Sequence, residues 1–201
     1  MTIVNDGSAH GIGQYRFPHN YELAGRKFSF EAREEKKFLF FQDCHRLSFN
    51  GAEYEYECHK IENNIYFVRY GLGALVLDTA EDRFFLLNED EGCADMSGTD
   101  IIWNYGFGRT LRRRHGEGSA CEYMWSGGDG FTSTAVRSRH IRDGVYFVDF
   151  ECLIPAQLNP AGGVCRVVML EDYERLMFTG CIICGDSVTM TGGYAAFPEA
   201  E

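Results

Sequence analysis

The sequence predicts an all-β protein, an antiparallel β-barrel built from two related halves. The phrase HKIENNIYFV (59–68) returns eighty residues later as RHIRDGVYFV (139–148), so one strand–turn–strand unit is used twice. Aromatic residues, which favour strands, make up 14% of the chain. Apolar stretches follow one another about every 8–12 residues with Gly, Asn or Asp between them, which is the spacing of a barrel or sandwich.

The first half is predicted to span residues 21–115, after an irregular tail of residues 1–20 that is rich in Gly, Asn, His and Ser. Its strands alternate apolar and polar residues or form compact apolar runs. In order they are LAGRKFSFEA, KKFLFFQD, HRLSFNG, AEYEYECHKI, NIYFVRYG, GALVLDT and DRFFLLNED. Between two of them stands Asn63-Asn64, a dipeptide that favours the positive φ of a tight hairpin turn.

The second half, residues 116–201, repeats this order with Asp143-Gly144 at the hairpin position. Its predicted strands are CEYMW, GFTSTAVRSRHI, GVYFVDFECLI, VCRVVMLED, RLMFTGCII and SVTMTGGYAAF. Arg175 corresponds to Arg83 at a separation of 92 residues, because the loop LIPAQLNPAGG is inserted after the repeated phrase of the second copy. Each copy must bury an apolar face, and a curved sheet can do so by closing on itself, which also removes its edges. We therefore expect the two halves to pack as one globular unit.

Composition limits the classes of partner. The formal net charge of −11 argues against nucleic acid and against an anionic membrane surface. No apolar run approaches the roughly 20 residues of a membrane span, and the start of the chain lacks the pattern of a secretory signal. The eight cysteines are scattered, so we expect reduced thiols, no disulfide and a cytoplasmic protein. A homodimer is left open.

The phrases DGVYFVDFECLIP and VCRVVMLEDYERLMFTGCI, with NNIYFVRY and GALVLDTAEDR, resemble the molybdenum cofactor biosynthesis protein F (MoaF) family over most of residues 20–90 and 120–185. The resemblance implies a calycin fold, a lipocalin-like barrel with an interior ligand cavity. GVYFVDFE also looks like a strand of the phenolic acid decarboxylases, cofactor-free barrels that act on hydroxycinnamates. Those enzymes carry an inward glutamate six positions after the tyrosine, where Cys152 and Leu72 stand in this chain. Glu151 is one residue off and on the opposite face, so that glutamate does not transfer.

The register implied by this resemblance turns alternate residues of the repeated strand inward. They are Tyr66, Val68 and Tyr70 in the first copy, and Tyr146, Val148, Phe150 and Cys152 in the second. The outward residues are Arg69, Asp149 and Glu151. Tyrosine hydroxyls and a thiol inside a barrel can orient a phenolic or carbonyl ligand, because a buried hydroxyl needs a partner. The alternative is core packing alone.

The strand AEYEYECHK has two chemically distinct faces. The face expected to point inward consists of Tyr54, Tyr56 and Cys58. The other face is expected in solvent, since ionised Glu is rarely buried unpaired, and consists of Glu53, Glu55, Glu57 and His59. In the reverse register Glu55, Glu57 and His59 would form a general acid–base set in a desolvated cavity.

Positive charge gathers at two places. His140 nearly matches His59 in the second copy, and its neighbours Arg139 and Arg142 can bind a carboxylate. The stretch GRTLRRRHGEG contains Arg109, Arg112, Arg113, Arg114 and His115. It either captures an anionic ligand near a barrel mouth or is a solvated connector between the halves, as charge runs usually are. No metal site is expected, because the one CxxC, Cys181 and Cys184, lies in an apolar strand without a second pair.

We therefore expect a small-molecule site inside the barrel. The leading hypothesis is a cofactor-free enzyme of lyase, isomerase or cyclase type, acting on a small conjugated or aromatic anion. Its candidate catalytic residues are His59, His140, Glu55 and Glu151. The candidate ligand-binding residues are Tyr54, Tyr56, Tyr66, Tyr70, Tyr146, Phe150, Cys152 and Arg139. The alternatives are a non-catalytic carrier or, from the resemblance, an accessory protein of molybdenum cofactor biosynthesis. Buried ionisable groups would favour the enzyme, and a lining of only Phe, Leu, Met and Tyr would favour the carrier.

Overall fold

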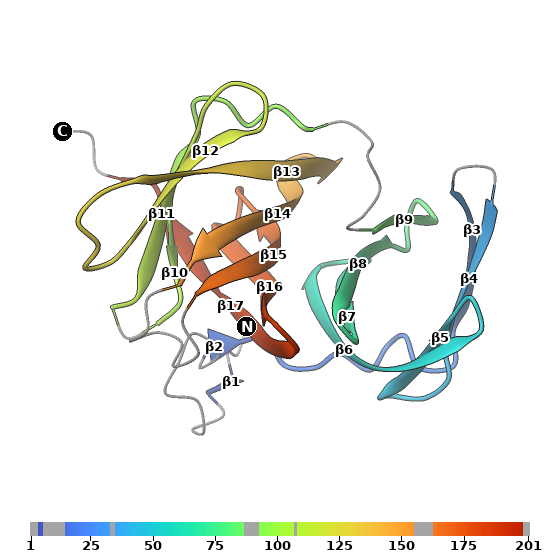
Figure 1. Ribbon diagram of the computed structural model, residues 1–201. Helices are drawn as coiled ribbons and strands as arrows, with labels where there is room; N and C mark the ends of the chain where they lie inside the picture. The colour runs from blue at the N-terminus through green and yellow to red at the C-terminus, as the bar shows by residue number, and fades with distance from the viewer. Residues whose placement is uncertain are drawn as a thin grey trace. The chain divides into compact units, whose positions relative to one another are not determined.

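The computed structural model describes residues 4–5, 15–32, 35–86, 93–106, 108–154 and 163–198. The chain divides into two compact units, one of residues 18–89 and one of residues 1–17 together with 90–201. The regular elements of the described residues are antiparallel β-strands (Figure 1). The predicted all-β fold, a calycin-like antiparallel barrel, is therefore confirmed. None of the described residues forms a helix long and apolar enough to cross a membrane.

The second unit contains a closed barrel of eight strands that neighbour one another in chain order. They are β10 (Asp100–Asn104), β11 (Thr110–His115), β12 (Ala120–Trp125), β13 (Thr132–Arg142), β14 (Val145–Leu153), β15 (Val164–Asp172), β16 (Met177–Cys184) and β17 (Ser187–Ala196). The barrel is closed by pairing between β10 and β17, which includes the pair Asn104 and Tyr194. A short ladder of β1 (Val4–Asn5) and β2 (Tyr15–Arg16) is also described, so the tail expected to be irregular contains some pairing.

The first unit is a curved sheet of seven strands, again neighbours in chain order (Figure 1). They are β3 (Lys27–Ala32), β4 (Glu35–Phe41), β5 (Arg46–Phe49), β6 (Ala52–Glu62), β7 (Ile65–Tyr70), β8 (Gly73–Asp78) and β9 (Arg83–Leu86). Its two edge strands approach each other through aromatic side chains, because the ring centroids of Phe30 and Phe84 are 4.2 Å apart. The sheet is thus nearly closed, with aromatic packing between its two edge strands.

The repeated phrase corresponds to a repeated structure. Strands β6 and β7 pair with a register shift between Lys60 and Glu62, and β13 and β14 pair with the equivalent shift between His140 and Arg142. The hairpin residues Asn64 and Gly144 have φ angles of 67° and 71°. The predicted equivalence of residues 59–68 and 139–148 as strand–turn–strand units is therefore confirmed.

The second part of the repeat is offset by two residues from the expected alignment. Asp78 pairs with the first residue of β7 and Asp172 with the first residue of β14, so these aspartates are equivalent and 94 residues apart. Each accepts hydrogen bonds from two backbone amides of the turn that follows it. Each also binds one arginine, Arg83 at 3.5 Å and Arg175 at 2.9 Å. Arg83 and Arg175 therefore make equivalent ion pairs with equivalent aspartates, although the two arginines do not occupy equivalent positions in the repeat.

The expected boundary between residues 115 and 116 falls inside the closed barrel. His115 of β11 pairs with Cys121 of β12, so the chain continues through the barrel at that point. The division lies instead near residues 17–18 and 89–90. Sequence repetition did not show this, because the seven strands of the first copy end with β9 and the next described strand, β10, already belongs to the barrel.

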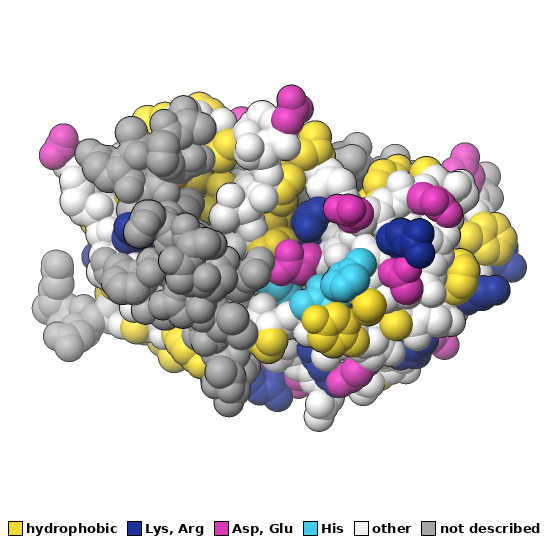
Figure 2. All heavy atoms as spheres, turned by 90° about the horizontal axis from the view of Figure 1, so that it is seen from below, with side chains coloured by type: hydrophobic (Ala, Val, Ile, Leu, Met, Phe, Trp, Pro, Cys, Tyr) yellow, Lys and Arg dark blue, Asp and Glu magenta, His cyan; other side chains and the backbone are white. Residues whose placement is uncertain are grey.

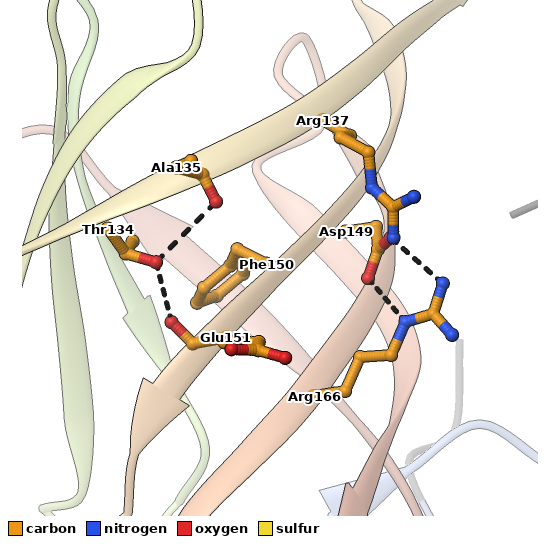
Figure 3. A pocket seen from close by; sticks show the side chains of 7 residues that line it. All are labelled: Thr134, Ala135, Arg137, Asp149, Phe150, Glu151 and Arg166. Atoms are coloured by element: carbon orange, nitrogen blue, oxygen red, sulfur yellow. Dashed lines mark hydrogen bonds and ion pairs between the residues drawn. The ribbon is translucent and has the colours of Figure 1, made fainter. Parts of the chain in front are cut away.

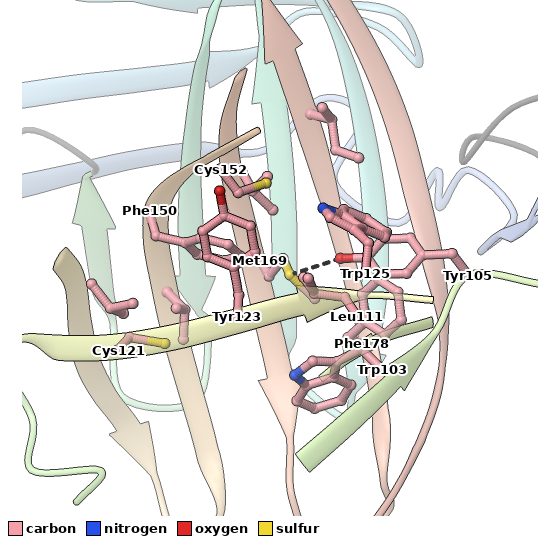
Figure 4. Packing of buried hydrophobic residues seen from close by; sticks show 14 of the residues in the cluster. Trp103, Tyr105, Leu111, Cys121, Tyr123, Trp125, Phe150, Cys152, Met169 and Phe178 are labelled. Atoms are coloured by element: carbon pink, nitrogen blue, oxygen red, sulfur yellow. Dashed lines mark hydrogen bonds between the residues drawn. The ribbon is translucent and has the colours of Figure 1, made fainter. Parts of the chain in front are cut away.

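Each unit has its own apolar core, and the predicted inward register is confirmed in both. Val148, Phe150 and Cys152 belong to the barrel core, and Tyr146 packs against it. Figure 4 shows Phe150 and Cys152 among the buried side chains of this core. In the seven-stranded sheet the inward side chains include Tyr54, Tyr56, Cys58, Tyr66, Val68 and Tyr70. The reverse register of β6, which would have placed its glutamates inside, is therefore wrong.

The expectation of eight free thiols is wrong. Cys165 of β15 and Cys184 of β16 form a disulfide. The other six cysteines are not part of a disulfide: Cys44, Cys58, Cys93, Cys121, Cys152 and Cys181. The bonded residues are 19 apart in the sequence but face each other across neighbouring strands, with Cα atoms 4.6 Å apart. Spacing alone does not show this, because pairing depends on the register of two strands joined by a turn.

Candidate functional site

Strand β11 contains most of the predicted arginine cluster, and its alternation divides the cluster between two faces. Arg112 and Arg114 bind the carboxylate of Asp100 on β10, at 2.7 Å and 3.1 Å. Arg113 lies on the other face, which it shares with Leu111 of the barrel core, and its side chain is fully buried. The expectation of a solvated connector is therefore wrong for Arg113, which belongs to the barrel interior.

The Arg113 guanidinium forms a buried ion pair with Glu171 of β15. Its Nη2 donates to Oε1 of Glu171, and the Tyr173 hydroxyl donates to Oε2 at 3.1 Å. The guanidinium carbon lies 4.9 Å from the ring centroid of Phe150 and 5.7 Å from a ring of Trp103. Such contacts stabilise a cation that has left water. We call Arg113, Glu171 and Tyr173 the interior triad.

Some polar atoms near the triad have no hydrogen-bond partner in the described part of the chain. They are Nε and Nη1 of Arg113, Nε1 of Trp103 and Nε2 of His115. Buried donors almost always have an acceptor, and leaving one without costs about 1–3 kcal/mol. A bound anion or carbonyl compound on the inward face of β10 and β11 would supply acceptors to the arginine and the indole.

Burial shifts the titration of the groups around the triad. Burial raises the pKa of Glu171, although the Arg113 charge acts in the opposite direction. Burial and the Glu171 charge raise the pKa of Tyr173 well above its ordinary value. Burial and the Arg113 charge lower the pKa of His115 to about 3. A carboxyl group of raised pKa beside a tyrosine hydroxyl, away from water, is suited to giving or taking a proton.

We expect His115 to make the barrel less stable in mild acid. The pKa of His115 is lowered in the folded chain and is about 6.5 in the unfolded chain. Below about pH 6.5 the unfolded chain therefore binds a proton at His115 and the folded chain does not, which favours unfolding. Stability should fall as the pH drops from about 6.5 towards 3, by about 2 kcal/mol between pH 7 and pH 5. Urea unfolding at the two pH values measures this loss. His115→Gln should show a smaller loss, and an equal loss in both proteins would contradict the assignment.

From the triad, aromatic side chains continue to the hairpin end of β13 and β14. Tyr146 stands directly opposite Glu171 in the β14–β15 ladder. Its ring centroid is 5.4 Å from that of Tyr173, in an edge-on arrangement, and 5.4 Å from that of His140. Tyr146 and Tyr173 are half-buried and His140 is exposed. Two residues predicted from the sequence, Tyr146 and His140, thus lie between the triad and solvent.

A pocket of about 300 Å³ opens on the outer wall of the barrel (Figure 3). It lies where β13 and β14 separate, because the last pair of their ladder is Val136 with Phe150. Asp149 lies between Arg137 and Arg166 and accepts hydrogen bonds from both. The Asp149 carboxylate balances part of their charge, so this pocket offers an anion little net positive charge.

The predicted ligand-binding residues belong to two separate cores. Tyr146, Phe150 and Cys152 line or join the core of the barrel. Tyr54, Tyr56, Tyr66 and Tyr70 belong to the core of the seven-stranded sheet. Arg139 pairs with Phe147 and alternates with the inward residues of β13, so it faces outward and cannot serve the interior.

The predicted catalytic residues are mostly on outward faces. Glu55 and Glu151 are exposed, because alternation places their neighbours inward. His59 shares the outward face of Glu57, with its Nε2 atom 3.1 Å from Oε1 of Glu57, but its side chain is fully buried, so the expectation that it lies in solvent is wrong. Only His140 lies on an inward face, at the end of the barrel beside Tyr146. The catalytic role of these four residues remains a prediction.

Sequence reasoning missed Glu171 and Tyr173. The signal was present in VCRVVMLEDY, where Cys165, Val167 and Met169 alternate inward. The same alternation of every second residue continues to Glu171 and Tyr173, so both are expected to face inward. The apolar run hid an inward carboxylate at its end.

Histidines also gather on the surface of the first unit (Figure 2). The ring centroids of His19 and His45 are 5.6 Å apart, and burial lowers the pKa of His19. Among the described residues, no group of three or more His, Cys, Asp or Glu side chains is placed to hold a metal ion.

No family model and no curated protein matches the chain. Among solved structures it is similar to the crystal structure of a "putative beta-lactamase from Burkholderia vietnamiensis", at 11% identity and a TM-score of 0.41. The match covers 54% of this chain and 100% of that chain. A likeness this distant carries no argument about function.

Proposed function

We propose that the barrel of the second unit is a cofactor-free enzyme that acts on a small conjugated or aromatic anion, with the interior triad at its chemical centre. The observation that carries the proposal is a fully buried Arg113 with two nitrogen atoms that lack partners among the described residues, beside a carboxyl group of raised pKa. Arg113 holds the negative group of the substrate, since its planar guanidinium suits a carboxylate. Glu171 and Tyr173 give or take the proton in a lyase, isomerase or cyclase reaction.

Ionisable groups inside the barrel favour an enzyme over a carrier. A carrier of apolar molecules needs only a lining of apolar and aromatic side chains. A buried ion pair is often no more stable than well-packed apolar residues of the same volume. Arg113, Glu171 and His115 therefore have a clearer purpose in chemistry than in packing.

The remaining expectations about function and location have less structural support. An accessory role in molybdenum cofactor biosynthesis follows from the sequence resemblance alone. A cytoplasmic location also stays a proposal, and the Cys165–Cys184 disulfide argues against it, since disulfides are rare in reducing compartments. A small-molecule partner is the one that the interior triad supports.

Binding can be followed without a label, because both tryptophans of the chain, Trp103 and Trp125, belong to the barrel core. We expect benzoate, cinnamate or sorbate to change their fluorescence at lower concentration than the corresponding neutral amides. Arg113→Gln should weaken carboxylate binding by about 10-fold or more, the scale of a hydrogen bond to a charged group. Arg112→Gln is the matched control, because Arg112 lies on the opposite face of β11 and binds Asp100. Equal affinity for acids and amides, or equal effects of the two variants, would overturn the anion site.

Catalysis is tested with the acid that binds best, by loss of its conjugated absorbance. Tyr173→Phe and Glu171→Gln should each lower turnover by about 100-fold or more, as expected when a general acid or base is lost. Tyr173→Phe removes a single hydroxyl and is the milder change. If the wild-type protein binds the acid but does not transform it, the carrier reading replaces the enzyme.

A further inference from the structure

Three cysteines stand in one row across three neighbouring strands of the barrel. Cys152 of β14 lies directly opposite Cys165 of β15, and Cys165 is bonded to Cys184 of β16. Directly opposite residues of paired strands point to the same face of a sheet. Cys152 and Cys165 both belong to the barrel core, and Cys184 packs against it. A free thiol and a disulfide are therefore neighbours inside the barrel.

The spacing of the row places Cys165 within bonding reach of both neighbours. The Cα atoms of Cys165 and Cys184 are 4.6 Å apart, the spacing of a non-hydrogen-bonded antiparallel pair. Cys165 then turns its backbone N–H and C=O towards β14, and its Cα lies roughly 5.5 Å from that of Cys152, the spacing of a hydrogen-bonded pair. Both separations fall in the range of about 4.4–6.8 Å that a disulfide spans.

We propose that this row is a thiol–disulfide exchange site in which Cys165 bonds to either Cys184 or Cys152. The Cys152 thiol loses its proton, and its sulfur attacks Sγ of Cys165. A Cys152–Cys165 bond forms, the Cys165–Cys184 bond breaks, and the electron pair leaves on Sγ of Cys184, which takes up a proton. Numbers of thiols and disulfides are unchanged, so the exchange needs no external oxidant or reductant.

The surroundings of Cys152 set the conditions of the exchange. Burial raises the pKa of the Cys152 thiol to about 12, with Trp125 and Arg113 acting in the opposite direction. The attacking species is the thiolate, so exchange is slow at neutral pH and faster in base. A pocket of about 320 Å³, lined in part by Tyr123, Trp125 and Leu153, opens at the residue that follows Cys152 on β14.

Exchange changes which strands are linked covalently. In one state the bond joins β15 to β16, and in the other it joins β14 to β15. The second state frees Cys184, which is half-buried and closer to solvent than the fully buried Cys165. The row thus converts a buried thiol into a more accessible one without any loss of the disulfide.

Peptide mapping of the wild-type protein tests the exchange directly. The protein is held without added thiol or oxygen between pH 7 and pH 10, acidified to stop the exchange, unfolded in mildly acidic guanidinium chloride so that buried thiols are accessible, labelled with N-ethylmaleimide and digested with pepsin. At pH 7 the bond should join Cys165 and Cys184, with six labelled cysteines. At higher pH a Cys152–Cys165 peptide with labelled Cys184 should appear, at an initial rate that rises about tenfold per pH unit. Eight labelled cysteines at pH 7 would overturn the proposal.

Variants decide the case if the second state does not accumulate. Cys184→Ser, incubated with oxidised glutathione, should form the Cys152–Cys165 bond, so two of its seven remaining cysteines resist labelling. The Cys152→Ser and Cys184→Ser double variant should form none, and Cys121→Ser should keep the original bond. A Cys184→Ser protein that folds, as judged by tryptophan fluorescence, and labels at all seven cysteines overturns the proposal.

Discussion

Glu171→Ala should destabilise the barrel by about 3–5 kcal/mol, the largest effect we expect from a single side chain. The change leaves Arg113 fully buried with no carboxylate opposite it, and removing one partner of a buried pair leaves an uncompensated charge in a medium of low dielectric. It also removes the acceptor of the Tyr173 hydroxyl. Urea unfolding followed by tryptophan fluorescence measures the loss, because Trp103 and Trp125 both report on the barrel.

Two further proteins separate charge from size in this experiment. Glu151→Ala removes an exposed carboxylate from the adjacent strand and should change the stability by no more than about 0.5 kcal/mol. The double variant Arg113→Met with Glu171→Leu replaces the ion pair by apolar residues and should recover most of the loss. The explanation fails if Glu171→Ala costs less than about 1 kcal/mol or if the double variant is less stable than the single one.

Much of the fold follows from local sequence. The repeated phrase specifies a hairpin because Asn64 and Gly144 accept a positive φ at the same place in both copies. Alternation then fixes which side chains face inward, and it predicted the inward positions of Tyr66 and Tyr146 correctly. These features depend on contacts between residues close in the chain, which a sequence pattern records.

The candidate site depends on contacts between residues far apart in the sequence, which the sequence pattern does not show. Arg113 stands between Arg112 and Arg114, so the run suggests solvent, yet strand geometry turns only its middle member inward. Its partner Glu171 is 58 residues away and follows an apolar run. Alternation counted from Leu111 and from Met169 would have predicted both inward positions. No pattern would have shown that they meet, because that depends on the closure of the barrel.

Gly193→Ala should open the closing seam of the barrel and destabilise it by about 3 kcal/mol or more. A Cβ atom at Gly193 would lie 2.1 Å from the carbonyl oxygen of Asn104 and 3.0 Å from the Phe178 ring. The Asn104 carbonyl belongs to β10 beside its pairing with Tyr194, so it cannot retreat without breaking the β10–β17 ladder. Overpacking usually costs about 1–3 kcal/mol, and contact with rigid backbone places this change at the upper end.

The matched control is Gly130→Ala, where a new Cβ would meet no atom within 4 Å and the backbone does not need a glycine. That variant should be as stable as the wild type or slightly more so, because alanine reduces the freedom of the unfolded chain. Hydrogen exchange adds a local measurement. In Gly193→Ala the amides of β10 and β17 should lose protection before those of β14 and β15, since the damage begins at the seam. If protection falls equally in all strands, or if the urea midpoint is unchanged, close backbone approach at Gly193 is not what closes the barrel.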